Sequence, residues 1–232
     1  MICGCKEKES TESVNSDVSS DFSVSSVTSV ASDVPAMAGD TILDPQGGEN
    51  GRPMGETVNI SDVEPKNGIH NGIDVSKWQG KIDWSKVKNA GIDFAVIRIG
   101  FRGENGKIYK DEYADYNIQQ ASRNGVLVGV YFFSTAVNTN EAAEEAEWVK
   151  ENIKYYPVSL PVVYDCEGFH NSASRMYNLS NKQRTDNALS FIEKIKSLGY
   201  DAMFYASKND LETAFETERI EAKSEIWVAH FD

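Results

Sequence analysis

Short apolar runs alternate with helix-forming segments over residues 68–232, and this alternation is the feature that most constrains the fold. The apolar runs predict buried strands at residues 94–100, 127–133, 160–164, 202–206 and 226–230. The segments around them predict helices at residues 83–89, 111–123, 140–154, 179–198 and 208–216. Strands that alternate with helices favour an α/β fold with a parallel sheet. We expect residues 100–103 to form a turn, and they lack a phosphate-loop pattern.

Two carboxylates follow the strand predicted at residues 160–164. One residue separates Asp165 from Glu167, so on an extended chain both point the same way and Cys166 points the other. Two like charges at one strand end repel, which pushes their pKa values apart and keeps one group protonated near neutral pH. Glycoside hydrolysis needs such a pair, with one proton donor and one anion near a developing positive charge.

Another acid lies in a similar setting about ninety residues earlier. Asp74 falls within residues 72–80, a strand-like run with the sequence GIDVSKWQG. Two acidic sites so far apart in sequence converge only if a sheet brings their ends together. A parallel barrel does this, because its functional groups gather at the carboxyl ends of the strands.

Composition excludes several functional classes. The net charge of −13 argues against a nucleic-acid partner. We expect no metal and no cofactor, because His70, His170 and His230 lie far apart and lack ligand spacing with a cysteine or an acid cluster. No apolar run is long enough to span a bilayer. Three cysteines give no disulfide framework, and we expect Cys166 to be a buried core residue.

The first 67 residues differ in kind from the rest. They hold 12 acidic and 4 basic side chains, against 24 and 19 in residues 68–232, and Ser and Thr fill about half of residues 10–32. Such a segment cannot bury enough apolar surface to offset its ordering entropy, so we expect a disordered tail before a single domain at residues 68–232. Its start, Ile-Cys-Gly-Cys, resembles the end of a bacterial lipoprotein signal. Cys5 is therefore the expected lipidation site and the only expected link to a membrane.

With both acidic sites in view, residues 68–232 resemble glycoside hydrolase family 25, the lysozymes that cleave bacterial cell wall. The stretches that carry the resemblance follow the family's order: GIDVSKWQG at 72–80, IDWSKV at 82–87, FAVIRIG at 94–100, GVYFF at 129–133, PVVYDCE at 161–167 and IWVAH at 226–230. An Asp-x-Glu strand alone is weak, because chitinase-like families also carry one. Its combination with the Asp-Val-Ser-Lys-Trp-Gln run near the domain start is specific.

The resemblance implies a catalytic domain on an irregular β/α barrel. It implies that Glu167 is the general acid, with Asp165 as its partner and Asp74 as a third carboxylate of the site. The family hydrolyses the β-1,4 bond between N-acetylmuramic acid and N-acetylglucosamine, so the implied partners are peptidoglycan glycan strands. The implied location is extracellular, at the cell surface or on a lipid anchor.

Four more residues are expected to bind substrate. Tyr131 and Trp227 fall where the family has aromatic residues along its groove, and aromatic faces suit the apolar C–H surfaces of sugar rings. We place Trp78 and Arg98 in the same group, and we expect Trp84 to be a packing anchor. Arg98 either neutralises the acids from inside the barrel or pairs with an outer acid.

Alternatives remain open at this point. Family members continue past the position of Asp232 with strands that close the barrel, so we expect this chain to lack its last strands. A non-catalytic carbohydrate-binding protein on the same scaffold and a chitinase-like hydrolase are the competing functions. The resemblance also leaves open whether the anomeric centre is inverted or retained, because retention through the substrate's own N-acetyl group lies outside the two-carboxylate scheme.

Overall fold

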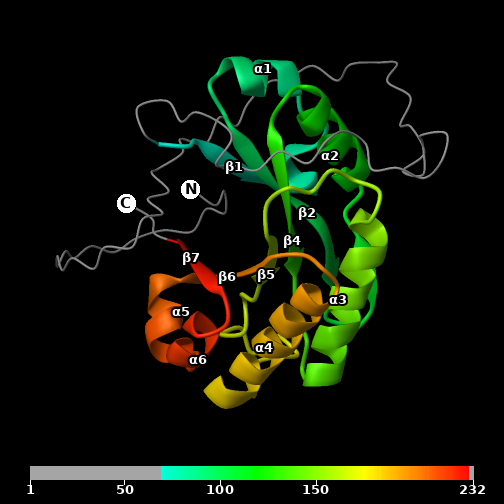
Figure 1. Cartoon of the computed structure of the whole chain (residues 1–232). Helices are drawn as coiled ribbons and strands as arrows, with labels where there is room; N and C mark the ends of the chain where they lie inside the picture. Colours follow the sequence, from blue (N-terminus) through cyan, green and yellow to red (C-terminus); the bar gives the residue numbers. More distant parts are fainter. Residues whose placement is uncertain (1–68, 230–232) are drawn as a thin grey trace.

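The computed structural model describes residues 69–229, so the predicted tail and Cys5 lie outside the described residues (Figure 1). The domain boundary at residue 68 stays a prediction. Seven strands form one sheet: β1 (Gly72–Val75), β2 (Phe94–Arg102), β3 (Ile108–Lys110), β4 (Leu127–Phe133), β5 (Val162–Asp165), β6 (Ala202–Ser207) and β7 (Glu225–Ala229). The strand order is β1-β2-β4-β5-β6-β7 with every neighbouring pair parallel, while β3 pairs antiparallel with β2. The predicted α/β fold with a parallel sheet is confirmed.

Helices connect the parallel strands and lie over one face of the curled sheet (Figure 1). They are α1 (Trp84–Asn89), α2 (Ala114–Arg123), α3 (Thr139–Ile153), α4 (Asn181–Ser197), α5 (Lys208–Thr213) and α6 (Thr217–Glu221), with a short 3-10 helix η2 (Lys77–Gln79) after β1. The long pair α3 and α4 pack against each other. Each begins at a polar cap, because Asn138 and Ser180 accept hydrogen bonds from the backbone N–H of the first turn. Gly199 ends α4 with a φ of 89°, as its position in the sequence predicts.

The sheet is apolar on both faces. Side chains such as Val162 and Tyr164 of β5 join the large core between the sheet and the helices. Val163 points to the opposite face, where it joins a smaller cluster with Tyr205 of β6. Strand alternation therefore gives β5 two buried faces and sends Asp165 to the same side as Val163.

The turn predicted at residues 100–103 is wrong. β2 continues through Arg102 and forms a hairpin with β3, in which Phe101 is paired with Tyr109. The rings of Phe101 and Tyr109 stack with centroids 5.4 Å apart, and Arg102 is buried against α3. Arg102 and Glu145 are 43 residues apart, so their contact is not visible in the local pattern, in which the glycines at 100 and 103 indicate a turn.

Two other predicted segments are shorter or broken. The strand-like run at residues 72–80 is extended only through Val75, because Ser76 then caps η2 through a reciprocal bond with Gln79. The helix predicted at residues 208–216 ends early, because α5 stops at Thr213 and α6 begins only at Thr217. The break follows the burial of Phe215, which packs edge-on against Phe204 of β6 at 5.0 Å.

A buried polar network joins the carboxyl ends of β2, β4 and β5 to α3. Arg102 Nε donates to Glu145 at 2.6 Å, and both side chains are almost fully buried. Ser134 Oγ lies 2.6 Å from the other Glu145 oxygen and 3.0 Å from the Tyr164 hydroxyl. The backbone N–H of Ser134 also donates to the carbonyl of Asp165 at 2.8 Å. The network therefore fixes the strand end from which the acidic side chains project.

Candidate active site

Asp165 is the last residue of β5 and lies between the ends of β4 and β6. Its Cα partners are Phe133 on β4 and Tyr205 on β6, and only 7% of the residue is exposed. Glu167 follows two residues later and is partly buried, and Gly168 then turns the chain away with a φ of 76°. The predicted convergence of Asp165 and Glu167 is present, although Glu167 lies just beyond the strand.

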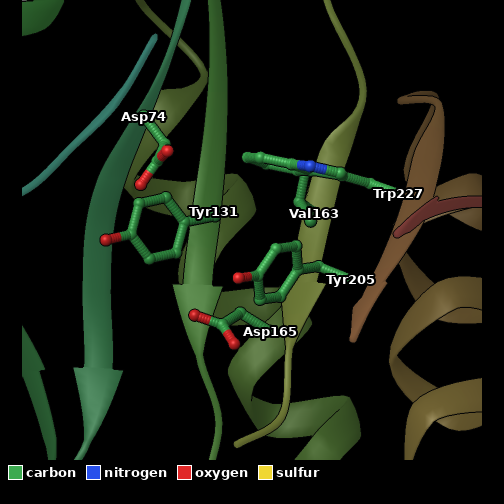
Figure 2. A pocket seen from close by; sticks show the side chains of 6 residues that line it. All are labelled: Asp74, Tyr131, Val163, Asp165, Tyr205 and Trp227. Carbon is green, nitrogen blue, oxygen red and sulfur yellow. The ribbon is translucent and has the colours of Figure 1, made fainter. Parts of the chain in front are cut away.

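A pocket opens on the face of the sheet opposite the helices. Its lining comes from five of the parallel strands: Asp74, Tyr131, Val163, Asp165, Tyr205 and Trp227. Figure 2 shows the Tyr131 ring between the carboxylates of Asp74 and Asp165, with the Trp227 indole across the opening. The Trp227 ring meets Tyr205 edge-on, with centroids 4.8 Å apart and planes at 72°. The structure thus brings together the two strand-borne acids and the two aromatic residues named from the sequence.

Burial and mutual repulsion raise the proton affinity of the acid pair. Burial raises the pKa of Asp165 well above its ordinary value, and the charges of Glu167 and Asp74 raise it further. Arg98 acts in the opposite direction. Burial also raises the pKa of Glu167, although a hydrogen bond with Tyr205 lowers it. The proton belongs to the coupled pair, so the pair keeps one near neutral pH more readily than isolated carboxyls do.

The Arg98 guanidinium forms an ion pair with an acid outside the pocket. Its Nε and Nη2 lie 2.8 and 2.7 Å from Asp111 Oδ2, and Asp111 also accepts from the backbone N–H of Lys77 at 2.9 Å. Arg98 therefore pairs with an outer acid, one of the two expected alternatives, and its charge also lowers the pKa of Asp165, which burial and the neighbouring acids nevertheless hold well above its ordinary value. A role for Arg98 in substrate binding stays a prediction.

The two tryptophans near the domain start differ sharply. Trp84 is 1% exposed, and its Nε1 donates to Asn117 at 3.1 Å, so the predicted packing anchor is confirmed. Trp78 is 76% exposed and does not line the pocket. It follows β1 on η2, at the carboxyl edge where Asp74 also lies.

Sequence reasoning missed Asp210, whose negative charge raises the pKa of Glu167. Asp210 lies in the first turn of α5, where its backbone N–H donates to Ser207 at 3.0 Å. Its Oδ1 lies 2.7 Å from His170 Nε2, and this contact joins α5 to the loop that carries Glu167. In the sequence, Ser207 is followed three residues later by Asp210, and helix capping alone explains this pattern.

Sequence reasoning also missed Tyr205. Its ring lines the pocket, and its hydroxyl interacts with Glu167. The predicted strand at residues 202–206 could have identified it, because alternation puts Met203 and Tyr205 on one face.

Within residues 69–229, no group of three or more His, Cys, Asp or Glu side chains is arranged to hold a metal ion. None of the described helices is both long and apolar enough to cross a membrane. Cys166 is buried on the helix side of β5, with its sulfur 3.8 Å from that of Met176, as expected of a core residue.

Comparison with known proteins assigns the family. Residues 73–232, more than half of the chain, match the family described as glycosyl hydrolases family 25. The chain belongs to this family. A lysozyme of Streptomyces coelicolor of known structure is 33% identical, with a TM-score of 0.57 over 69% of this chain and 74% of that one.

Other members of family 25 extend the comparison. Lysozyme M1 of Streptomyces globisporus is 34% identical over 170 residues, which cover 69% of this chain and 54% of that protein. The chain thus spans about half the length of this curated relative. The autolysin LytC of Streptococcus pneumoniae, solved with a synthetic peptidoglycan ligand, is 25% identical with a TM-score of 0.60, over 69% of this chain and 37% of that one.

We expect Asp210→Asn to lower the pKa of Glu167. The asparagine keeps the backbone contact with Ser207 but removes the negative charge that raises this pKa. The measurement is a pH titration of the Glu167 carboxyl by carbon NMR, with Glu167→Gln identifying the signal. Asp186→Asn is the matched control, because Asp186 is an acid on α4 that pairs with Lys182 and Arg219. Equal Glu167 pKa values in both variants would contradict the expectation.

Proposed function

We propose that the protein hydrolyses the glycan strands of peptidoglycan, at the β-1,4 bond between N-acetylmuramic acid and N-acetylglucosamine. The observation that carries this proposal is the carboxyl pair of the buried Asp165 and the partly buried Glu167, at and just beyond the end of β5, beside a pocket with aromatic walls. Membership of family 25 and similarity to an autolysin that binds a peptidoglycan ligand support the same substrate.

In this mechanism Glu167 is the general acid. It is partly exposed, so its carboxyl can reach the oxygen of the leaving sugar, while its raised pKa keeps the proton available near neutral pH. As the bond breaks, positive charge develops on the anomeric carbon. The carboxyls of Asp165 and Asp74 line the pocket. In their ionised form they stabilise this positive charge as it develops.

The aromatic walls hold the sugar ring over the acids. Tyr131 and Trp227 present ring faces and edges to the pocket, and sugar C–H faces pack well on such surfaces (Figure 2). Tyr205 has a second task, because its hydroxyl interacts with Glu167 and sets the direction of that carboxyl. Tyr205 thus connects the sugar-binding pocket to the proposed acid, which lies beside it.

Replacement of Glu167 by glutamine should abolish turnover while the fold remains intact. The amide cannot protonate the leaving oxygen, and general acid catalysis is typically worth about 10²–10⁴ in rate. Release of reducing sugar from purified cell wall measures the rate, and Glu193→Gln, an exposed glutamate on α4, is the control. Near-parental clearing by Glu167→Gln would reject the assignment. A parent protein that binds wall glycan without cutting it would point to a carbohydrate-binding role, and one that cuts chitin oligosaccharides equally well to a chitinase-like enzyme.

Asp165 and Asp74 should affect the pH profile to different extents. The upper pKa of the coupled pair sets the alkaline limb, because the acid must be protonated to work. Asp165→Asn removes the negative charge that repels the ionised form of Glu167. We therefore expect the alkaline limb of the pH profile to move to lower pH and the rate of hydrolysis to fall. Asp74→Asn removes a smaller contribution to the pKa of Asp165 and should move the limb less. Rates of wall hydrolysis from pH 4 to 9 test this, and identical profiles for both variants and the parent would count against distinct roles.

We further propose that the domain acts outside the cytoplasmic membrane on a lipid anchor at Cys5. The proposal rests on the Ile-Cys-Gly-Cys start and on the Ser- and Thr-rich segment behind it. Expressed from its natural gene, the protein should enter the membrane fraction. Cys5→Ala should leave that fraction, whereas Cys3→Ala should stay in it. Parent protein found wholly in the medium or the cytosol would refute the anchor.

A further inference from the structure

An exposed group of aromatic rings around one lysine lies beside the pocket. We call it the Trp78 ledge and define it as Lys77, Trp78, Phe101 and Tyr109. Trp78 and Tyr109 are 76% and 40% exposed and are two of the few large apolar side chains left open to solvent among residues 69–229. The ledge comes from η2 and from the β2–β3 hairpin. None of its members lines the pocket, so the ledge is a separate surface.

The ammonium of Lys77 is held between two rings. Its Nζ lies 4.9 Å from the ring centroid of Trp78 and 6.0 Å from that of Phe101. The backbone N–H of the same residue donates to Asp111 at 2.9 Å, which fixes the chain beneath it. No ion pair joins Lys77 to an acidic side chain in the part of the chain that the structure describes. Among residues 69–229, the ammonium of Lys77 therefore interacts with ring faces and with no carboxylate, and a ring face attracts a cation more weakly than a carboxylate does.

The other half of the ledge is rigid. Phe101 and Tyr109 stack with planes 25° apart, and the Arg98 guanidinium lies 5.3 Å from the Phe101 centroid. Asn105 Nδ2 donates to the Tyr109 hydroxyl at 2.7 Å. A surface that is already ordered loses little conformational entropy when a ligand binds.

The ledge is linked to the acid site by short connections. Lys77 follows Asp74 by three residues, and Asp111 joins the Lys77 backbone to Arg98, whose charge acts on Asp165. Trp227 lies on β7 at the other end of the strand order from β1. A glycan that extends from the acids toward the β1 end would therefore approach Trp78.

We propose that the Trp78 ledge binds a carboxylate-bearing muramic acid residue of the glycan, with the sugar on the Trp78 ring and the carboxylate on Lys77. The proposal rests on the proposed function and names the part of the substrate that this surface recognises. Muramic acid without a peptide carries a free carboxylate on its lactyl group. Where a peptide is attached, that carboxyl is part of an amide bond and the carboxylates of the peptide carry the charge. The net charge of −13 repels such a polymer. A lysine that has no carboxylate partner among residues 69–229 and lies next to an exposed ring is therefore a favourable place for an acidic sugar to bind.

The test measures binding separately from catalysis. Glu167→Gln protein serves as the background, and calorimetry gives the dissociation constant for three glycans of equal length: peptide-bearing muramyl glycan, the same glycan with its peptides removed, and a chitin oligosaccharide. Lys77→Gln should weaken binding of the muramyl glycans, which carry carboxylates, about three- to fivefold, the range of an exposed ion pair, and leave the uncharged chitin oligosaccharide unchanged. Trp78→Ala should weaken binding of all three, by roughly tenfold, through loss of ring contact. Thermal unfolding checks that each variant is folded.

Lys81→Gln is the matched control. Lys81 is also a lysine over an aromatic ring, with its Nζ 5.2 Å from the ring centroid of the partly exposed Tyr116, but it lies outside the ledge. A loss with Lys77→Gln confined to the peptide-free muramyl glycan supports the lactyl carboxylate, which is free only there. A loss confined to the peptide-bearing glycan supports the peptide carboxylates, and a loss on both shows that Lys77 accepts either. Equal affinities in the Lys77 and Lys81 variants would overturn the proposal. So would a Trp78→Ala variant that binds all three glycans normally and instead loses self-association or a protein partner. None of these outcomes depends on turnover, so a failure of the hydrolase assignment is seen separately in the wall-digestion assay.

Discussion

Hydrogen bonding between parallel strands decides where the acids of this protein lie. In the register of β4, β5 and β6, Asp165 falls level with Phe133 and Tyr205 and faces the pocket rather than the helices. The register is held at that point by the Ser134 N–H, which donates to the Asp165 carbonyl, and by the buried hydrogen bond of Ser134 to Glu145, which is paired with Arg102. A slip by one residue would send the carboxylate into the apolar core.

Burial of Asp165 is costly, and the surrounding charges do not remove that cost. The nearest cation, Arg98, forms its ion pair with Asp111 and only partly offsets the repulsion from Glu167 and Asp74. A proton shared by Asp165 and Glu167 relieves this repulsion, and the proposed acid Glu167 needs such a proton to work.

The sequence was sufficient for the parts that depend on local pattern. The buried runs predicted the parallel strands, and Asp74, Asp165, Tyr131 and Trp227 do line one pocket. It failed where distant partners contribute. β2 extends through Arg102, where a turn was expected, and the Arg102 side chain is paired with Glu145, 43 residues away.

The residues that tune the site were hidden for a related reason. Asp210 has the pattern of a helix cap and Tyr205 that of an ordinary strand residue, and only their spatial closeness to Glu167 reveals a second role. Such closeness arises from the order of β5 and β6 in the sheet, which no local spacing encodes.

Strand alternation also separates two chemistries that would interfere with each other. Cys166 lies between the two acids in sequence, and sulfur is a better nucleophile than either carboxylate toward an electrophilic sugar carbon. Because the side chain points to the helix side and is 2% exposed, the thiol cannot reach the pocket. Burial also raises the pKa of Cys166, so the reactive thiolate does not form there. The pleat of one short strand thus protects the enzyme from capturing its own substrate as a thioglycoside.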